Sequence, residues 1–124
     1  MTDDRHEAKY ALIAALEDGW HEHGSLRVHQ TTLAHTRAIL DKVDHADLPP
    51  FAPTGDGHVV FEVDLVAEDG TGWWGTGSIE AARMYLLRVE GREGPGKECY
   101  AAYDEAAFIA FLKDGTMPEG SVDA

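Results

Sequence analysis

The chain has 124 residues, of which 23 are Asp or Glu and 10 are Lys or Arg, so its formal net charge is −13. A hydrophobic share of 44% is enough for one ordinary core, which predicts a folded domain and argues against wholesale disorder. No apolar run approaches the roughly 20 residues that span a bilayer, so no membrane segment is expected. The negative charge argues against direct binding to nucleic acid.

Two helices are predicted in the N-terminal third of the chain. Apolar residues recur at helical spacing from about Asp4 to Asp18, and Gly19 is expected to end this first helix. The second helix is predicted from about Thr32 to Asp44, with Thr31 or Thr32 capping its first amides. Between them, residues 20–30 fit either a short strand or a segment that leads into the second helix.

The second half of the chain is predicted to form an antiparallel sheet. Pro49, Pro50 and Pro53 indicate an extended connector that ends the helical half. Residues 58–68 then alternate between two faces. One face carries Val59, Phe61, Val63, Leu65 and Ala67, and the other carries His58, Val60, Glu62, Asp64, Val66 and Glu68.

Turn residues divide the remaining strands. Asp69-Gly70 predicts a tight hairpin, and residues 72–79 would form the returning strand. A second hairpin is predicted from residues 84–90 and 98–103, although a helix over residues 79–89 fits the pattern as well.

The C-terminal part is predicted to contain one more helix. Asp104 is expected to cap a helix over residues 105–113, which Gly115 ends. The polar tail, residues 116–124, is expected to be disordered. This order predicts an α+β fold with two N-terminal helices, an antiparallel sheet of three to four strands and a C-terminal helix, in a single domain over residues 1–115.

An acidic interval, residues 43–82, is the most informative feature of the chain. It contains no Lys or Arg and eight acids, which are Asp44, Asp47, Asp56, Glu62, Asp64, Glu68, Asp69 and Glu80. A field of one sign attracts basic partners or cations. Because residues two apart on a strand project side by side, Glu62, Asp64 and Glu68 are candidate partner-binding residues.

The Trp pair supplies the other candidate binding residues. Trp73 and Trp74 are consecutive and flanked by glycines. On a strand they face opposite sides, so at most one of them enters the core. The other is either covered by a further part of the chain or available to a partner, and the flanking glycines would let a partner approach the backbone.

Histidines offer a metal-binding alternative. His21 and His23 form an H-x-H pair that suits zinc on a strand or loop, and His58 shares the row of the strand carboxylates. The helical H-E-x-x-H spacing of metalloproteases is absent, and Cys99 has no second cysteine to pair with. The sequence predicts no particular cofactor.

No catalytic motif emerges, so the favoured function is a non-catalytic protein-binding module. It would dock a basic partner through the acidic sheet face and an exposed aromatic residue. Size and charge are, by analogy alone, typical of regulatory, inhibitory or immunity proteins of phage and bacteria. The alternative is a small enzyme or ligand-binding domain with a pocket between sheet and helices, where His58 with Glu62 or Asp64 acts as the base.

Two further expectations concern assembly and location. A homodimer is an alternative way to cover the second Trp. The lone cysteine, and an N-terminus without the basic and apolar regions of a secretory signal, lead us to expect a cytoplasmic protein.

Overall fold

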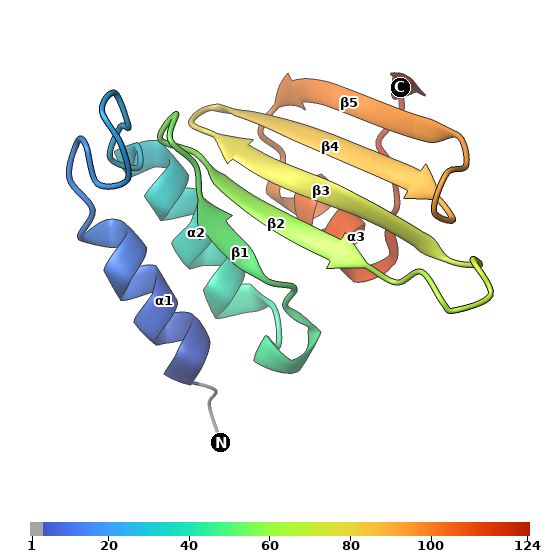
Figure 1. Ribbon diagram of the computed structural model, residues 1–124, viewed down its shortest axis with the longest axis horizontal. Helices are drawn as coiled ribbons and strands as arrows, with labels where there is room; N and C mark the ends of the chain where they lie inside the picture. The colour runs from blue at the N-terminus through green and yellow to red at the C-terminus, as the bar shows by residue number, and fades with distance from the viewer. Residues whose placement is uncertain (1–3) are drawn as a thin grey trace.

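The computed structural model describes residues 4–124, which form three α-helices, one short 3-10 helix and a six-stranded antiparallel sheet. The strands follow one another across the sheet in chain order, from β1 to β6 (Figure 1). Helices α2 and α3 both lie behind the sheet in this view, and the near face carries no helix. The predicted α+β class is confirmed. Within residues 4–124, no helix combines the length and the apolar character needed to cross a membrane.

The two N-terminal helices end earlier than predicted. Helix α1 spans Asp4–Ala14 and α2 spans Gln30–Lys42, with a loop between them. The predicted cap of α2 by a threonine is wrong, because His29 is the N-cap residue and makes no side-chain cap hydrogen bond. The hydroxyl of Thr32 is buried and instead accepts a hydrogen bond from the Ala81 amide at 2.8 Å. Thr32 therefore ties α2 to the sheet.

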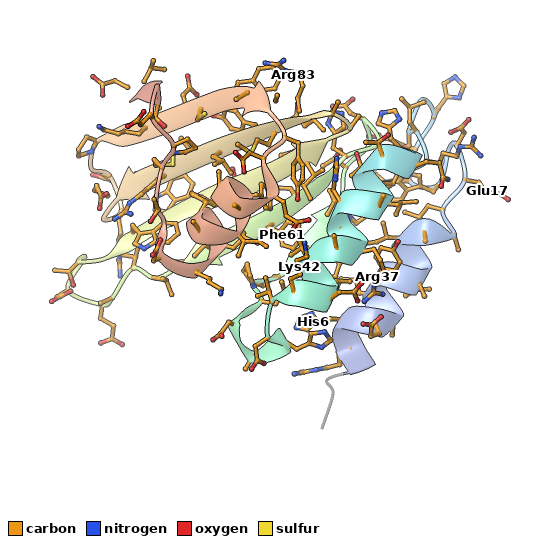
Figure 2. All side chains as sticks on the ribbon, turned by 180° about the vertical axis from the view of Figure 1, so that it is seen from behind. His6, Glu17, Arg37, Lys42, Phe61 and Arg83 are labelled. Atoms are coloured by element: carbon orange, nitrogen blue, oxygen red, sulfur yellow. The ribbon has the colours of Figure 1, made fainter. Side chains whose placement is uncertain are left out.

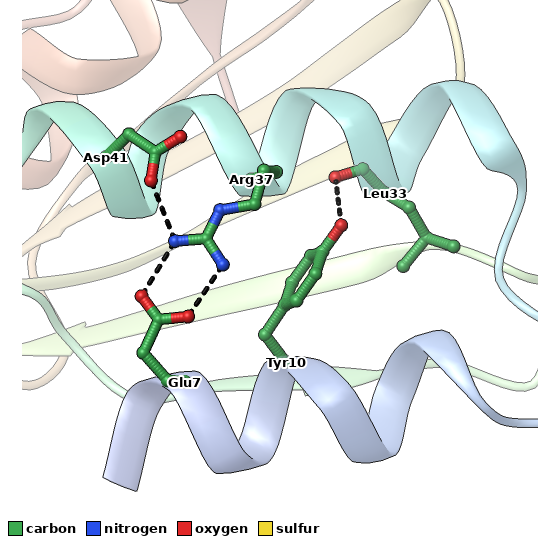
Figure 3. Close-up of polar contacts among 5 residues, drawn as sticks. All are labelled: Glu7, Tyr10, Leu33, Arg37 and Asp41. Atoms are coloured by element: carbon green, nitrogen blue, oxygen red, sulfur yellow. Dashed lines mark hydrogen bonds and ion pairs between the residues drawn. The ribbon is translucent and has the colours of Figure 1, made fainter. Parts of the chain in front are cut away.

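Helix α1 lies beside α2 and does not cover the sheet face (Figure 1). The Tyr10 hydroxyl donates a hydrogen bond to the Leu33 carbonyl at 3.2 Å, and Glu7 pairs with Arg37 (Figure 3). The Lys9 ammonium lies 5.1 Å from the centre of the Phe51 ring on β1. The helical layer therefore extends past the β1 edge of the sheet.

The sheet has six strands, so the prediction of three to four strands is wrong. The strands are β1 Phe51–Pro53, β2 Val59–Asp64, β3 Trp73–Glu80, β4 Arg83–Glu90, β5 Gly96–Ala102 and β6 Val122–Asp123. The two extra strands are the short edge strands β1 and β6. Neither shows a local alternating pattern, because each is defined by pairing with a longer neighbour.

The tail differs from the predicted disorder for the same reason. Its last residues form β6, which pairs with β5, and the Ala124 amide donates to the Gly96 carbonyl at 3.0 Å. Residues 79–89, for which a helix was the alternative, are strand on both sides of a tight turn. Ala81 in that turn has φ +59°, a conformation that interrupts any helix.

Strand β2 is shorter than the predicted strand over residues 58–68. Val59, Phe61 and Val63 point into the core as expected, whereas Leu65 is 58% exposed. The chain leaves the strand after Asp64 and turns back between Ala67 and Thr71, whose main-chain atoms are joined by a 2.7 Å hydrogen bond. The apolar residue at position 65 therefore lies past the region that the helices cover.

Helix α3, Glu105–Asp114, packs on glycines of β3. The Asp104 carboxylate accepts a hydrogen bond from the Ala107 amide at 3.1 Å, which confirms the predicted cap. Phe108 and Phe111 are fully buried. A Cβ on Gly77 would lie 3.0 Å from the Phe108 ring, and one on Gly75 would lie 3.1 Å from the Phe111 ring. The glycines thus admit the chain's own α3 to the β3 backbone.

Candidate functional site

One face of the sheet is covered by helices and the other is not. Alternation places even-numbered residues of β2, β3 and β5 and odd-numbered residues of β4 on the helix-free face. We call this surface the open face. Its residues are Val60, Glu62, Asp64, Trp74, Thr76, Ser78, Glu80, Arg83, Tyr85, Leu87, Val89, Glu98 and Tyr100.

Three of the predicted partner-binding residues meet on the open face. Glu62 and Asp64 are exposed on β2, and Trp74 is half-buried on β3. Asp64 stands directly opposite Trp74 in the ladder, and Glu62 stands opposite Thr76. Directly opposed side chains are close enough to contact one partner together.

The other two predicted residues lie elsewhere. Trp73 is only 7% exposed and packs edge-on against Phe111, with 5.5 Å between ring centres. Its ring belongs to the core, so it offers no surface to a partner. Glu68 lies in the loop between β2 and β3, because the strand ends before it. The row of three carboxylates is therefore reduced to Glu62 and Asp64.

Apolar side chains from β4 form the centre of the open face. Tyr85, Leu87 and Val89 are all half-buried there, beside Trp74. The prediction of binding residues missed Leu87 and Val89. Their signal was visible, since β4 is apolar on both faces, with Met84 and Leu86 in the core. A strand that is apolar on both sides indicates that both sides are packed or available for packing.

Polar contacts order the β5 side of this face. The Tyr85 hydroxyl donates a 2.7 Å hydrogen bond to Glu98. Burial and this contact raise the pKa of Tyr85 to about 12, so the phenol keeps its proton at neutral pH. The Arg83 guanidinium lies 4.4 Å from the centre of the exposed Tyr100 ring. The open face therefore has an apolar centre with acidic groups on both sides.

Three shallow hollows follow β2 one after another. The largest, about 570 Å³, is lined by Asp47, Pro49, Pro50, Glu62, Asp64 and Lys113, among others. A second begins at Asp64 and continues to Trp74 and Arg92. A third shares Pro50 and Glu62 with the first and extends towards Lys9 and Phe51. Glu62 and Asp64 thus form the boundaries between consecutive hollows.

The histidines predicted as metal ligands do not come together. His21 and His23 are exposed in the loop between α1 and α2. The His58 ring lies 5.7 Å from that of His29. Within residues 4–124, no three His, Cys, Asp or Glu side chains are grouped as a metal site.

The acid–base pair of the enzyme hypothesis is also widely spaced. His58 precedes Glu62 by four residues, which is roughly 13 Å along an extended chain. The space between the sheet and the helices is filled by the core. Phe61, for example, is fully buried and lies between α2 and α3 in the view from the helix side (Figure 2). The geometry therefore does not favour a pocket around His58.

Comparison with known protein families, with curated proteins and with solved structures gave no match.

Proposed function

We propose that this protein is a non-catalytic protein-binding module, which docks a partner with a basic surface through the open face of its sheet. The observation that supports this most directly is the cross-strand pair of Asp64 and Trp74. An exposed carboxylate beside a half-buried indole combines charge recognition with apolar contact area. Interfaces typically combine an aromatic anchor with a polar rim in this way.

The charge distribution supports a basic partner. The acidic interval has no lysine or arginine. Four ion pairs of the described residues use acids that lie outside this interval, namely Glu7, Asp41, Glu90 and Glu105. The one-signed field of this interval would steer a basic surface towards it.

The experiment compares partners retained by immobilised variants. Wild-type protein, the charge reversal Glu62→Lys with Asp64→Lys, and Trp74→Ser are each incubated with native lysate, and bound proteins are quantified by mass spectrometry. The matched control is Glu17→Lys with Glu22→Lys, which changes the charge equally in the exposed loop after α1, where Figure 2 labels Glu17. All variants are first checked for folding by circular dichroism.

We expect to recover a basic protein that binds both the wild type and the control. Its retention should fall by about tenfold or more with the β2 reversal, because two attractive charges become repulsive, and tenfold corresponds to about 1.4 kcal/mol. Trp74→Ser should weaken the same partner, and retention should decrease with added salt. Partners that bind the β2 reversal and Trp74→Ser as well as they bind the wild type would count against the proposal.

A further inference from the structure

The main-chain edge of β2 is only partly covered by β1. The Glu62 amide donates to the Pro50 carbonyl at 3.0 Å, on the β1 side. The Leu65 amide donates to the Trp73 carbonyl at 2.9 Å, on the β3 side. Because successive residues of a strand alternate in this respect, the carbonyl of Glu62 and both the amide and carbonyl of Asp64 also point away from β3.

Proline explains why β1 does not cover this part of the edge. Ala52 pairs with Val60, so position 50 stands opposite Glu62. The nitrogen of Pro50 carries no hydrogen and cannot donate to the Glu62 carbonyl. The Leu48 amide, the next one that could face β2, donates to the His45 carbonyl and not to β2. Within residues 4–124, no main-chain donor reaches the Glu62 carbonyl, and no strand pairs with Asp64 on this side.

The space beside this uncovered edge is a hollow of about 570 Å³. Its walls are Pro49 and Pro50 on one side and the end of α3, with Leu112 and Lys113, on the other. An extended chain added to the ladder here would lie in this hollow, about 4.8 Å from β2.

Charge determines which chain fits. Asp47, Glu62 and Asp64 line the hollow against a single lysine, Lys113. Acidic side chains at a sheet edge normally prevent pairing with other strands. A strand with lysine or arginine at alternate positions would instead be attracted, and an acidic strand would be repelled.

We propose that an extended basic segment of a partner protein adds to the sheet as a strand at the Glu62–Asp64 edge, in the place where Pro50 stops β1. Its amides would donate to the carbonyls of Glu62 and Asp64, and one of its carbonyls would accept from the Asp64 amide. This inference rests on the proposed function, since it names the form in which the basic partner arrives.

A second copy of this chain is a poor occupant of the same edge. Pairing β2 with β2 of another molecule would bring Glu62 and Asp64 of both copies together. Like charges directly opposite one another destabilise a ladder, and each copy carries a net charge of −13. Charge complementarity therefore favours a basic segment over self-association.

The test uses two synthetic peptides of equal charge. One is the acetylated and amidated hexapeptide Val-Lys-Val-Lys-Val-Lys. The other carries an N-methyl group on the amide of every residue, so that it cannot donate along either edge. Binding is followed by amide NMR shifts and hydrogen exchange at low salt. At a peptide concentration of about ten times Kd, exchange of the Asp64 amide should slow about tenfold. The methylated peptide should bind about tenfold more weakly or worse, because hydrogen-bond donors are lost.

Two proline variants locate the edge. Pro50→Ala introduces an amide opposite the Glu62 carbonyl, so β1 can extend and compete with the peptide. We expect about fivefold weaker peptide binding, corresponding to one hydrogen bond. Pro49→Ala is the matched control, because alternation points the main chain of residue 49 away from β2. It should bind the peptide as the wild type does.

The outcomes separate this inference from the proposed function. Equal binding of both peptides, or an Asp64 amide whose exchange does not change, would refute strand addition while leaving charge-based docking intact. The same conclusion would follow if the β2 charge reversal released a natural partner and neither peptide bound. A third outcome is that sedimentation without peptide shows a dimer in which hydrogen exchange finds the Asp64 amide already protected. That result would assign the edge to self-association and overturn the proposal.

Discussion

At the scale of single residues, Gly115 shows two separate demands on one position. It ends α3 in the left-handed conformation, with φ +75°. A Cβ added there would lie 2.8 Å from the Trp73 ring and 2.6 Å from a nitrogen of Arg88. Arg88 in turn donates to the Gly115 carbonyl at 2.9 Å and lies over Trp73. The end of α3 is therefore closed tightly over the buried indole.

We expect Gly115→Ala to lower the free energy of unfolding by about 2–4 kcal/mol, of which about 1 kcal/mol reflects the left-handed backbone and the rest overpacking. Gly120→Ala is the matched control, since Gly120 has φ +86° but no atom within 4 Å of its added Cβ. Gly120→Ala should lower the free energy of unfolding by about 1 kcal/mol, because only the left-handed backbone opposes it. Urea denaturation of both variants gives the comparison, and equal losses would show that contact with Trp73 is unimportant.

At the scale of elements, α1 is held to α2 by a charged contact. Two nitrogens of Arg37 donate to the Glu7 carboxylate at 2.6 and 2.7 Å, and Arg37 also reaches Asp41 at 2.8 Å (Figure 3). The hydrogen bonds from Arg37 lower the pKa of Glu7. A lowered folded pKa means that, in acid, the native state binds fewer protons than the unfolded chain, so this contact weakens as pH falls.

We expect Glu7→Gln to reduce the free energy of unfolding at pH 7 and to have less effect in acid. The contribution of Glu7 is complete above the ordinary glutamate pKa of about 4.3 and is lost as pH falls through the lowered folded value. Urea denaturation at about pH 7, 5 and 3 should show the two proteins converging only at the lowest pH. Glu17→Gln, in the exposed loop, should match the wild type throughout. A constant difference at every pH would mean that Glu7 acts through packing instead of charge.

The contact between α3 and the sheet makes a second prediction for elements. Gly77→Ala places a methyl group 3.0 Å from the Phe108 ring, so we expect a loss of about 1–3 kcal/mol from overpacking. Phe108→Leu in the same chain should relieve part of this loss. The double variant should be more stable than the sum of the single changes by about 1 kcal/mol, measured by urea denaturation. Strict additivity would contradict a direct contact between these positions.

At the scale of the whole molecule, the net charge of −13 is unevenly distributed, because residues 43–82 contain eight acids and no Lys or Arg. Four ion pairs of the described residues use Glu7, Asp41, Glu90 and Glu105, which all lie outside the acidic interval. The eight acids of the interval have no Lys or Arg among them in sequence, so we expect them to repel one another in the folded state.

We expect salt to stabilise the protein at pH 7 by screening this repulsion. Between low and about 0.3 M sodium chloride the Tm should rise by a few degrees, since about 1 kcal/mol corresponds to roughly 4 °C in a domain of this size. The variant Glu62→Gln with Asp64→Asn should melt at a higher temperature in low salt and respond less to salt. A Tm that is independent of salt in both proteins would refute this account of the acidic interval.

Local signals in the sequence predicted a large part of this structure. The helical spacing in α1 and α2, the cap at Asp104 and the stop at Gly115 depend on residues within one or two turns, which a single sequence displays. Alternation likewise placed Val59, Phe61 and Val63 in the core and set the two tryptophans on opposite faces. The strong acidity of the chain and its concentration in residues 43–82 are properties of composition alone.

Pairing between distant segments required the tertiary structure. Strand β6 forms by pairing with the edge of β5. The Thr32 hydroxyl accepts from the Ala81 amide because α2 passes the β3–β4 turn. Which tryptophan is buried depends on the side that α3 occupies. The open edge at Glu62 depends on Pro50 standing opposite it, twelve positions away in sequence. Local sequence patterns specify elements and faces, whereas register and coverage depend on contacts between segments that are remote along the chain.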